Sequence, residues 1–406
     1  KLELFSSLRT RRSRLKNTKT FDEEAAAIIA SNPSAPSPET AEGESATESC
    51  DPATLNVEDL FGETLAQTQL EQQSVVEQIA GGQFNIDDYV RKLVEPFVVA
   101  KADPRQAEFI NGVDDAIAAT MRKLLHHPAF QQLEAAWTGM QMLVRRLETD
   151  SKLSIHIINI SKQQLADDVS GDDLTQSQLY KLLLVESTSV AGAEPWKLVV
   201  GNITCDEGPE DSELVGRVAR IHAAAGSVFV AAASPSVVGA DLVQSSDPDD
   251  WTPLVGECTE RWNRLRALPE ATHVALAMPR ILGRLPYGKA TDPIDSFAFE
   301  EIPDGQVHAD HLWLNPAFGV ATLLGAAFTT GVWSTELDHL PISIYNDGTE
   351  SVVKPCAEVE LILRAGDVLS ASGLTAVHTV RDQGMVLIPT VRSLSLDQNK
   401  LAGHWG

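Results

Sequence analysis

The alternation of strand-like and helix-like stretches in the middle of this chain constrains its fold more than any other feature. Short runs rich in Val, Ile and Ala predict strands at residues 153–160, 197–204, 227–232 and 272–278. Amphipathic stretches between them predict helices at residues 212–225 and 253–268. Strands that alternate with helices of this length are typical of a layered α/β fold whose sheet is largely buried. We therefore expect an α/β protein.

Helices are also expected on both sides of this alternation. Residues 104–127 predict a long helix, and Pro128 begins the next one because the first turn does not need its missing N–H group. Apolar residues then recur at intervals of three and four, which predicts one face packed on a core. These residues are Phe130, Leu133, Trp137, Met140, Val144 and Leu147. A long apolar helix at 316–333 closes the central domain.

Smaller patterns add detail at two places. Ser161 followed by Gln164, and Thr175 followed by Gln178, have the spacing of a capping box, which satisfies free N–H groups at a helix start. Beyond the central domain, shorter apolar runs at 359–363, 384–389 and 391–396 predict a smaller α+β tail.

Composition excludes several classes of protein. Lys and Arg number 32 against 57 Asp and Glu, so the net charge is 32 − 57 = −25, which argues against nucleic acid as a partner. Four scattered cysteines fit neither a disulfide framework nor a zinc site, and a reducing cytoplasm is the simplest location. The longest apolar run, 223–233, is far shorter than the roughly 20 residues that span a bilayer, so we expect no membrane insertion.

Charge is distributed unevenly near the start of the chain. Residues 1–20 hold seven Lys or Arg and one acid, whereas residues 21–90 hold no Lys or Arg at all. The arginines between Arg9 and Arg14 suggest either a basic arm for nucleic acid or one face of an amphipathic helix. Apolar residues at helical spacing, from Leu2 to Leu15, favour the helix.

A change of composition marks a linker after this basic head. Residues 32–53 are rich in Ser, Pro, Glu, Ala and Thr, and such a segment cannot bury enough apolar surface to offset its ordering entropy. We expect it to be disordered. Helical patterning resumes after it, and Leu60, Phe61 and Leu65 share one face of a predicted short helix.

The search for chemistry yields only isolated candidates. No nucleophile elbow, phosphate-binding loop, zinc-protease motif or dinucleotide fingerprint occurs in the sequence. His126 and His127 suggest either acid–base residues or a helix cap. His308, Asp310 and His311 suggest either a metal site or a surface loop, and the loop is favoured because no third ligand stands at helical spacing.

An acidic loop is the last candidate of this kind. Its residues Asp206, Glu207, Glu210 and Asp211 follow a predicted strand, where α/β folds bind ligands, although capping of the next helix is the simpler interpretation. Nothing here assembles a catalytic set. We expect no enzyme, no catalytic residues, no metal and no cofactor.

The segment around residues 279–288 has the character of a stiff loop. Pro279 and Pro286 bracket Arg280 and Arg284, and Tyr287 precedes a glycine that allows a turn. Such a loop presents two guanidinium groups either to carboxylates of an adjacent subunit or to acids of the same chain, for example Glu300 or Glu301.

Nine segments in colinear order resemble one protein family. They are residues 123–137 (KLLHHPAFQQLEAAW), 159–165 (NISKQQL), 174–180 (LTQSQLY), 194–202 (EPWKLVVGN), 229–236 (FVAAASPS), 262–268 (WNRLRAL), 278–288 (MPRILGRLPYG), 297–302 (FAFEEI) and 312–318 (LWLNPAF). Together they resemble the large subunit of the type VI secretion contractile sheath, the TssC/VipB family. This resemblance implies a contractile-sheath α/β core like that of phage tail sheaths, with N-terminal helices and a small C-terminal α+β unit.

The resemblance also implies a function and partners. Such a subunit is structural: it pairs with a small sheath subunit, polymerises with other copies around an Hcp-like inner tube, and drives that tube by contraction from a baseplate. An AAA+ unfoldase recycles the contracted sheath by gripping an N-terminal helix. In this chain the matching position is the predicted helix with Leu60, Phe61 and Leu65. An ordinary helix that packs against the rest of the protein would explain the same pattern equally well. Arg280, Arg284 and Tyr287 become candidates for a subunit contact.

Two departures from the family set the predicted domain plan. Residues 1–31 are similar to the C-terminal helices of the small subunit, TssB/VipA, which suggests a small–large fusion. The sequence stops at Gly406, where the family continues with strands that link subunits, so the alternative is a non-contractile, sheath-like adaptor at the baseplate or cap. The plan is small-subunit-like helices at 1–31, a linker at 32–53, a helical region at 54–127, the sheath core at 128–350 and a shortened α+β unit at 351–406.

Overall fold

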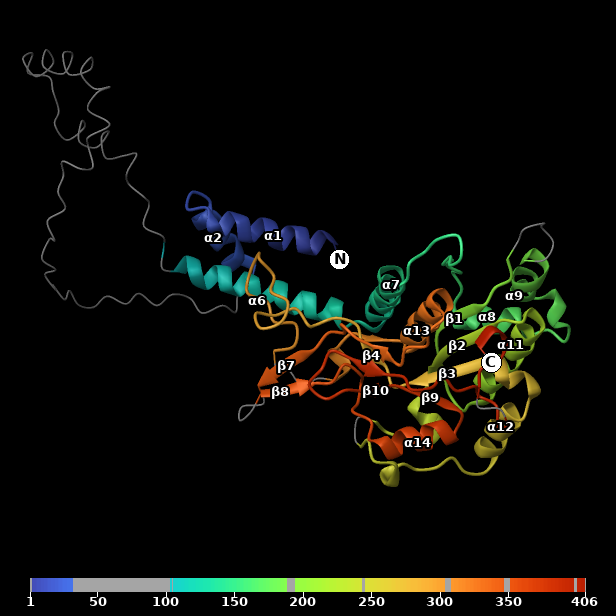
Figure 1. Ribbon diagram of the computed structural model, residues 1–406. Helices are drawn as coiled ribbons and strands as arrows, with labels where there is room; N and C mark the ends of the chain where they lie inside the picture. Colours follow the sequence, from blue (N-terminus) through green and yellow to red (C-terminus); the bar gives the residue numbers. More distant parts are fainter. Residues whose placement is uncertain are drawn as a thin grey trace, which may run out of the picture. The chain divides into compact units, whose positions relative to one another are not determined.

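The chain forms two compact units, which are described separately. The computed structural model describes residues 2–31, 103, 105–187, 194–242, 245–303, 308–346, 351–397 and 400–405. One unit runs from Lys1 to Ile117 and the other from Ala118 to Gly406, so the boundary falls within helix α6 (Arg105–Leu125) (Figure 1). The predicted linker at 32–53 and the predicted helix with Leu60, Phe61 and Leu65 lie outside the described residues.

The described residues of the first unit are mainly helical. It contains α1 (Leu2–Lys16), α2 (Phe21–Ser31) and the beginning of α6. Leu15 and Phe21 are buried, and the Phe21 ring meets Phe109 of α6 edge-on with centroids 5.9 Å apart. Gln106 Nε2 also donates to the Leu15 carbonyl at 2.6 Å. The predicted helix is therefore present, and Leu15 near its end is packed inside this unit.

Arginines of α1 are paired with acids of the same unit. Arg12 forms an ion pair with Asp114 of α6. Arg14 reaches the buried Glu24 carboxylate at 3.1 Å, and Arg11 lies 3.7 Å from the same side chain. These contacts favour the interpretation of the basic stretch as one face of a packed helix.

The second unit contains a parallel sheet. Its strand order is β1 (Leu198–Cys205), β2 (Val228–Ala233), β3 (Val274–Met278) and β9 (Leu374–Ala376), and every neighbouring pair is parallel. β2 and β3 are buried along their whole length, as expected for a sheet covered on both faces. The predicted α/β class and three of the predicted strands are confirmed.

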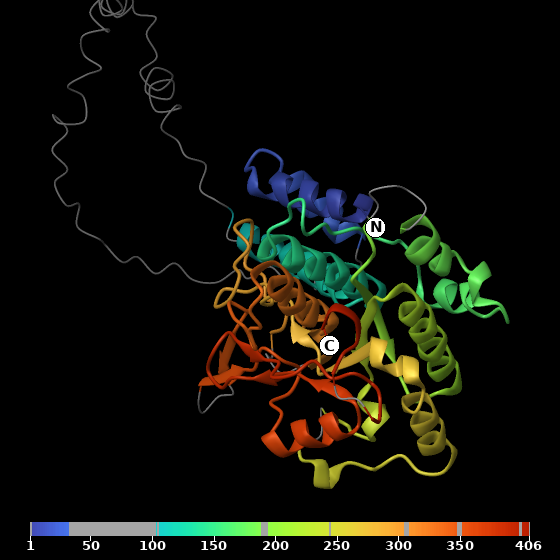
Figure 2. The ribbon, with the colours of Figure 1, turned by 45° about the vertical axis from the view of Figure 1, so that its right-hand side comes forward.

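Alternate residues of β2 face different helices. Phe229 and Ala231 belong to the core under α11 (Pro209–Ala225), which also holds side chains of α12 (Glu257–Arg266) and α14 (Leu363–Ala371). Val228 and Val230 belong to the core under α13 (Ala317–Thr330). The strands accordingly lie between α13 on one side and α11 and α12 on the other (Figures 1 and 2).

The chain beyond residue 350 contributes to this central sheet. β9 pairs with β3 in parallel, with Leu374 opposite Leu276, and its short sequence gave no strand signal. Of the three apolar runs predicted for the tail, only 384–389 holds a strand, β11 (Val386–Leu387); residues 359–363 lead into α14, and 391–396 contain only a bridge from Arg392 to Lys400. The division at residue 350 stays a prediction.

Three small antiparallel sheets complete the described part of the second unit. β6 (Glu336–Leu337), β10 (His378–Thr379) and β11 form one sheet, in the order β10, β11, β6. β4 (Ile281–Leu282) pairs with β5 (Trp313–Leu314), and β7 (Ser343–Asn346) pairs with β8 (Ser351–Lys354). None of the described helices is both long and apolar enough to cross a bilayer.

Helix α7 (Pro128–Arg146) begins as predicted but buries a different face. His127 caps it, with Nδ1 accepting from the Ala129 N–H at 3.3 Å. Its buried line is Gly139 and Leu143, followed by Leu147, and it packs against Phe318 and Ala321 of α13. A Cβ on Gly139 would lie 2.4 Å from the Phe318 ring, so this glycine lets the two helices approach closely.

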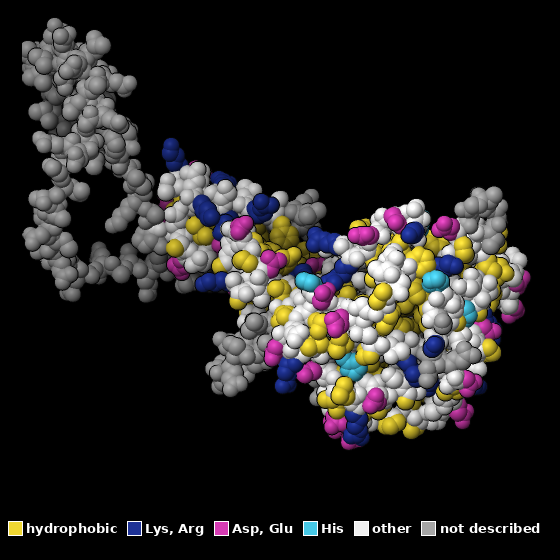
Figure 3. Space-filling model, in the orientation of Figure 1, with side chains coloured by type: hydrophobic (Ala, Val, Ile, Leu, Met, Phe, Trp, Pro, Cys, Tyr) yellow, Lys and Arg dark blue, Asp and Glu magenta, His cyan; other side chains and the backbone are white. Residues whose placement is uncertain are grey.

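The prediction of one core-facing stripe on α7 is therefore wrong for three of its members. Leu133, Trp137 and Val144 are exposed, Trp137 by 64%. Hydrophobic side chains appear on the surface where α7 lies (Figure 3). The physical reason is the tight contact at Gly139, which fixes the rotation of the helix and turns this line of large side chains outward.

The predicted strand at 153–160 is absent. This segment has no regular secondary structure and belongs to no sheet among the described residues. After it, Ser161 and Gln164 form the predicted capping box at the start of α8 (Lys162–Asp168). The second predicted capping box is wrong, because Asp173 caps one short helix and Ser177 caps the next, α9 (Gln178–Tyr180), in place of Thr175.

A fully buried histidine makes the second unit sensitive to acid. His222 Nδ1 lies 2.7 Å from Ser227 Oγ, and burial lowers the pKa of His222 to about 3. Since the pKa of an ordinary histidine is 6.5, this residue is protonated between pH 6.5 and 3 in the unfolded chain but stays neutral in the folded chain. Stability must fall as the pH drops from 6.5 towards 3.

We predict that the free energy of unfolding decreases by about 2 kcal/mol between pH 7 and pH 5 because of His222 alone. His222→Met should lower the free energy of unfolding at pH 7. It should also reduce the slope of that free energy against pH, because one fewer proton is taken up on unfolding. Urea unfolding at several pH values measures both effects. His339→Asn, at an exposed position, is the control and should keep the wild-type slope. An unchanged slope in His222→Met would contradict the assignment.

Candidate subunit-contact site

The loop that carries the candidate residues leaves the carboxyl end of β3. Ile281 and Leu282 of β4 are fully buried and pair with β5, with Ile281 opposite Leu314. The Leu282 N–H also donates to the Cys356 carbonyl at 2.6 Å. Backbone hydrogen bonds and buried side chains thus hold the segment between Arg280 and Arg284 in place. This agrees with the stiff loop that its prolines predict.

Arg284 holds two carboxylates at once. Its terminal nitrogens contact Glu301 at 2.7 and 3.0 Å, and its Nε donates to Glu134 of α7 at 2.6 Å. The Tyr287 ring centroid lies 4.5 Å from the guanidinium carbon, and the Tyr287 N–H donates to Glu301 at 2.8 Å. We call Arg284, Glu134, Glu301 and Tyr287 the Arg284 cluster.

Burial makes this cluster energetically important. Glu301 is only 2% exposed, and Arg284 and Glu134 are largely buried. Burial by itself lowers the pKa of the Arg284 guanidinium, but the hydrogen bonds to Glu301 and Glu134 outweigh it, so the pKa is raised. A charge held in this way is costly to leave without its partner.

His126 lies beside the same cluster. Its Nε2 is 3.8 Å from Glu301, and its Nδ1 is 3.4 Å from Asp310. Nε2 is buried without a hydrogen bond among the described residues.

Arg280 belongs to a second cluster. It donates to Glu358 at 2.9 Å through Nε, and His308 Nε2 lies 3.1 Å from the same carboxylate. Burial raises the pKa of Glu358, but the hydrogen bonds from Arg280 and His308 outweigh it and lower that pKa to about 2. The His308 ring stacks on Trp313 with centroids 5.0 Å apart. We call these four residues the Arg280 cluster.

The Arg280 cluster borders a small cavity at the carboxyl ends of β1, β2 and β3. The cavity measures about 180 Å³, and Arg280 and Glu358 form its charged wall. This is the edge at which α/β sheets bind ligands, but its two charged groups are already paired with each other. Arg280 remains 47% exposed, so its outer side is open to solvent.

The structure thus divides the three candidate residues between two clusters. Arg284 and Tyr287 meet at Glu301, as the intrachain alternative anticipated, whereas Arg280 pairs with Glu358, which the sequence did not suggest. Glu300 accepts instead from the Lys289 N–H at 2.9 Å. A role for these residues in a subunit contact stays a prediction.

The residues of the histidine-rich turn, 308–311, contact both clusters. His308 bonds to Glu358, Asp310 faces His126, and His311 is buried beside the Trp313 ring. In the described part of the chain, no three His, Cys, Asp or Glu side chains are placed to hold a metal ion together. These side chains instead connect the turn to its neighbours.

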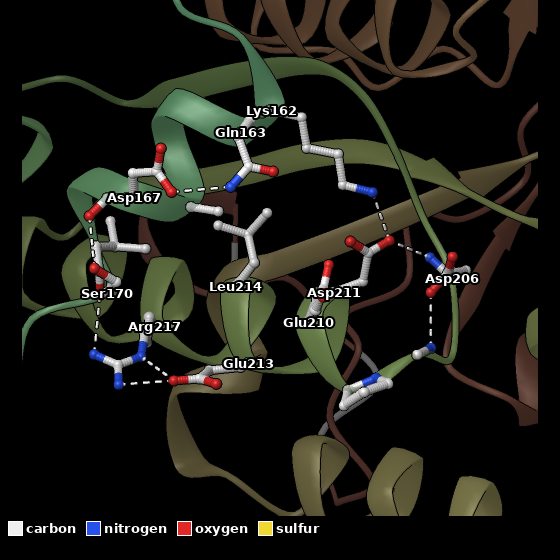
Figure 4. Close-up of a pocket in the computed structure, with 14 residues that line it drawn as sticks. Lys162, Gln163, Asp167, Ser170, Asp206, Glu210, Asp211, Glu213, Leu214 and Arg217 are labelled. Carbon is white, nitrogen blue, oxygen red and sulfur yellow. Dashed lines mark hydrogen bonds and ion pairs between the residues drawn. The ribbon is translucent and has the colours of Figure 1, made fainter.

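The acidic loop after β1 borders the larger cavity, of about 760 Å³ (Figure 4). Asp211 is buried and accepts from Lys162 Nζ at 2.6 Å and from the Asp206 N–H at 2.8 Å. Asp206 in turn accepts from the Gly208 N–H at 2.7 Å. On the far wall, Arg217 bonds to Glu213 at 2.8 Å. Asp206 and Asp211 thus build the turn before α11, but no side-chain hydrogen bond caps this helix at Gly208, so the predicted capping role is wrong. Glu210 and Asp211 instead place negative charge in its first turn, where the helix dipole favours it.

Sequence reasoning missed three members of these clusters. Glu134, Glu358 and Trp313 lie far along the chain from the arginines that they contact, and only the fold brings them together. Glu134 carried a weak signal, because it stands among apolar residues on a helix within one of the family-like segments. Glu358 carried none.

We predict that Arg284→Ala lowers the free energy of unfolding by about 3–5 kcal/mol, because it leaves Glu301 buried and unpaired. Arg280→Ala should cost only about 1 kcal/mol, since half of that side chain is in solvent. Arg145→Ala, on the exposed surface of α7, is the matched control and should change stability by less than about 0.5 kcal/mol. Urea unfolding measures all three, and equal effects of Arg284→Ala and Arg145→Ala would contradict the role of the cluster.

Comparison with known proteins identifies the family. The model of the VipB family, described as EvpB/VC_A0108 tail sheath N-terminal domain, matches residues 107–395. Over 233 residues the chain is 37% identical to the type VI secretion system sheath protein TssC1 of Pseudomonas aeruginosa, covering 56% of this chain and 47% of that protein. The chain thus spans about half the length of this curated relative. Because the family match includes α7, the parallel sheet and both charged clusters, this chain belongs to the VipB family of type VI secretion sheath proteins.

Proposed function

We propose that this chain is a structural subunit of a type VI secretion sheath, which polymerises around an Hcp-like inner tube and drives it by contraction. The family match over residues 107–395 carries this proposal, because it spans the entire parallel sheet and the helices that cover it. The identity to TssC1 supports the same role. The chain acts mechanically in this proposal and catalyses no reaction.

The second unit has the physical properties that such a role requires. Its sheet is covered on both faces, and α13 is buried from Ala317 to Gly325. The Arg284 cluster ties α7 to the loop after β3. A closely packed body of this kind moves as a unit, so a sheath changes length when contacts between subunits rearrange. We propose that this unit has the contractile-sheath core found in phage tail sheaths.

The partners follow from the same proposal. They are a small sheath subunit, other copies of this chain, the Hcp-like tube and baseplate proteins, all met in the cytoplasm. Arg280, Arg284 and Tyr287 are proposed to support a subunit contact. Arg280 is the best placed of the three, since its exposed side can reach a carboxylate on a neighbour while Glu358 holds the other side.

We also propose that residues 1–31 correspond to the C-terminal helices of the small subunit. The helices α1 and α2 support this, because they fold with the start of α6 into a compact unit of their own. A linker at 32–53 would then join the two parts of a fused protomer.

We expect the chain, co-expressed with the small sheath subunit from the same genome, to form hollow cylinders visible by negative-stain microscopy. Shortening of these cylinders on isolation would demonstrate contraction. Discrete complexes with secretion-system proteins, without cylinders, would instead indicate a non-contractile adaptor at the baseplate or cap. Only separate, monodisperse subunits under all assembly conditions would contradict the proposal.

Leu60, Phe61 and Leu65 are the proposed contact for an AAA+ unfoldase. Replacing all three with Ser should leave cylinder formation intact but abolish disassembly by the unfoldase and ATP, since apolar side chains supply most of the affinity in such contacts. Light scattering follows disassembly over time. As control, Leu55→Ser and Val57→Ser change nearby apolar residues. Disassembly at the wild-type rate in the triple variant would exclude this contact.

A further inference from the structure

Two arginines from distant parts of the chain meet where α14 ends. Arg266, on α12, is only 8% exposed, and its Nη2 donates to the Ala371 carbonyl at 3.0 Å. Arg392, in the chain after β11, donates through Nη2 to the neighbouring carbonyl of Ser370 at 3.1 Å. The two guanidinium groups thus share one helix end, and we call Arg266 and Arg392 the arginine pair.

The arginine pair has no carboxylate partner among the residues that the structure describes. Arg266 uses its Nε to donate to the Leu394 carbonyl at 3.1 Å, so its hydrogen bonds go to backbone oxygens. Those of the Arg392 side chain do the same, and its Nε is buried with no hydrogen-bond partner in the described part of the chain. A buried donor of this kind normally has a partner.

The charge of the pair exceeds what the helix end can offset. The carbonyl groups at the C-terminus of a helix act as roughly half a negative charge, whereas the pair carries two positive charges. About 1.5 positive charges therefore remain without compensation. Burial, together with the nearby charge of Arg392, lowers the pKa of Arg266, as expected for a buried cation without an acid beside it.

The surrounding backbone holds the arginine pair in place. Gly373 has a φ of +80°, and a Cβ there would lie 2.9 Å from Arg266 Nε, so only glycine leaves room for this side chain. The Arg392 N–H donates to Thr375 Oγ1 at 3.0 Å. Arg392 is only partly buried, and the exposed Lys400 lies opposite it in a β-bridge. A dissolved anion can therefore approach the pair from the side of Arg392.

We propose that the arginine pair is a binding site for a phosphate group. A guanidinium group offers parallel N–H donors that fit the oxygens of phosphate, and a phosphate monoester at pH 7 carries about 1.5 to 2 negative charges. That charge matches the excess on the pair, whereas a single carboxylate supplies only one. The phosphate group belongs either to the free ion or to a small phosphate ester.

Capping of α14 explains one of the two arginines but not both. Arginines near the end of a helix commonly bond to its last carbonyl groups, and one cation is enough for roughly half a negative charge. The second arginine adds repulsion and leaves its Nε without a partner. An anion between the two guanidinium groups removes the repulsion.

Calorimetric titration of the full chain with inorganic phosphate, at constant ionic strength, tests the site. We expect saturable binding of one phosphate per chain with a dissociation constant of about 1 mM, which corresponds to one or two hydrogen bonds between charged groups. Tighter binding of glycerol 3-phosphate would identify an ester as the ligand, and tighter binding of inorganic phosphate would identify the free ion. Absence of saturable binding of either compound would overturn the proposal.

Two glutamine substitutions locate the bound phosphate. Arg392→Gln keeps an amide donor but removes the charge, and it should weaken phosphate binding at least about tenfold. Arg264→Gln is the matched control, because Arg264 is an exposed arginine on the same helix as Arg266, and it should bind phosphate like the wild type. Equal weakening in both variants would indicate only general attraction to positive charge, and equal binding in all three proteins would place the phosphate elsewhere. Either result would overturn the site.

Urea unfolding gives a second measurement that also shows whether each variant is folded. With chloride as the reference at equal ionic strength, 10 mM phosphate should lower the unfolding equilibrium constant of the wild type about tenfold, since the ligand binds only the folded state. General salt effects act on every variant alike, so Arg392→Gln should keep only that part. Equal stabilisation of wild type and Arg392→Gln would contradict the site. Neither measurement requires assembly, so the site and the proposed function can fail independently.

Discussion

The burial of β2 and β3 on both faces is the constraint on which the rest of the second unit depends. A strand covered on two sides must be apolar throughout, and each of its faces needs a helical layer of its own. Phe229 and Val230, neighbours in β2, therefore belong to different cores, one under α11 and one under α13. The parallel order requires long crossovers, which place the ends of β1, β2 and β3, with their polar loops, on one edge of the sheet.

Ion pairs connect parts of the second unit that the hydrogen bonds between strands do not connect. Arg284 links α7 to the loop after β3 and to Glu301, while Arg280 links the same loop to Glu358 in the chain beyond β8. Glu301, which holds Arg284, is buried, so loosening that contact leaves a charge without compensation, whereas Glu358 keeps His308 as a second partner if Arg280 is lost. The segment between the two arginines is thus tied to its neighbours at both ends.

Much of this arrangement could be predicted from the sequence, because it depends on local patterns. The strands near 198, 228 and 274, the start of α7 at Pro128 and the capping box at Ser161 all follow from periodicity or from N–H groups at a helix start. β9 could not be found in this way, since three residues carry too little pattern and only the neighbouring β3 makes them a strand. The outward rotation of Trp137 was equally hidden, because it depends on the fit of Gly139 against Phe318, which lies far along the chain. Partners such as Glu358 depend on the same long-range placement.

The exposed isoleucines between α7 and α8 have a consequence for the cell that makes this protein. A β-branched segment with little charge adheres to similar segments on other chains, and six residues of this kind are enough to seed aggregates. Copies in which Ile157, Ile158 and Ile160 stay in water are therefore the first to be lost to aggregation or proteolysis. The exposure of this short segment thus limits the concentration at which the chain stays dispersed.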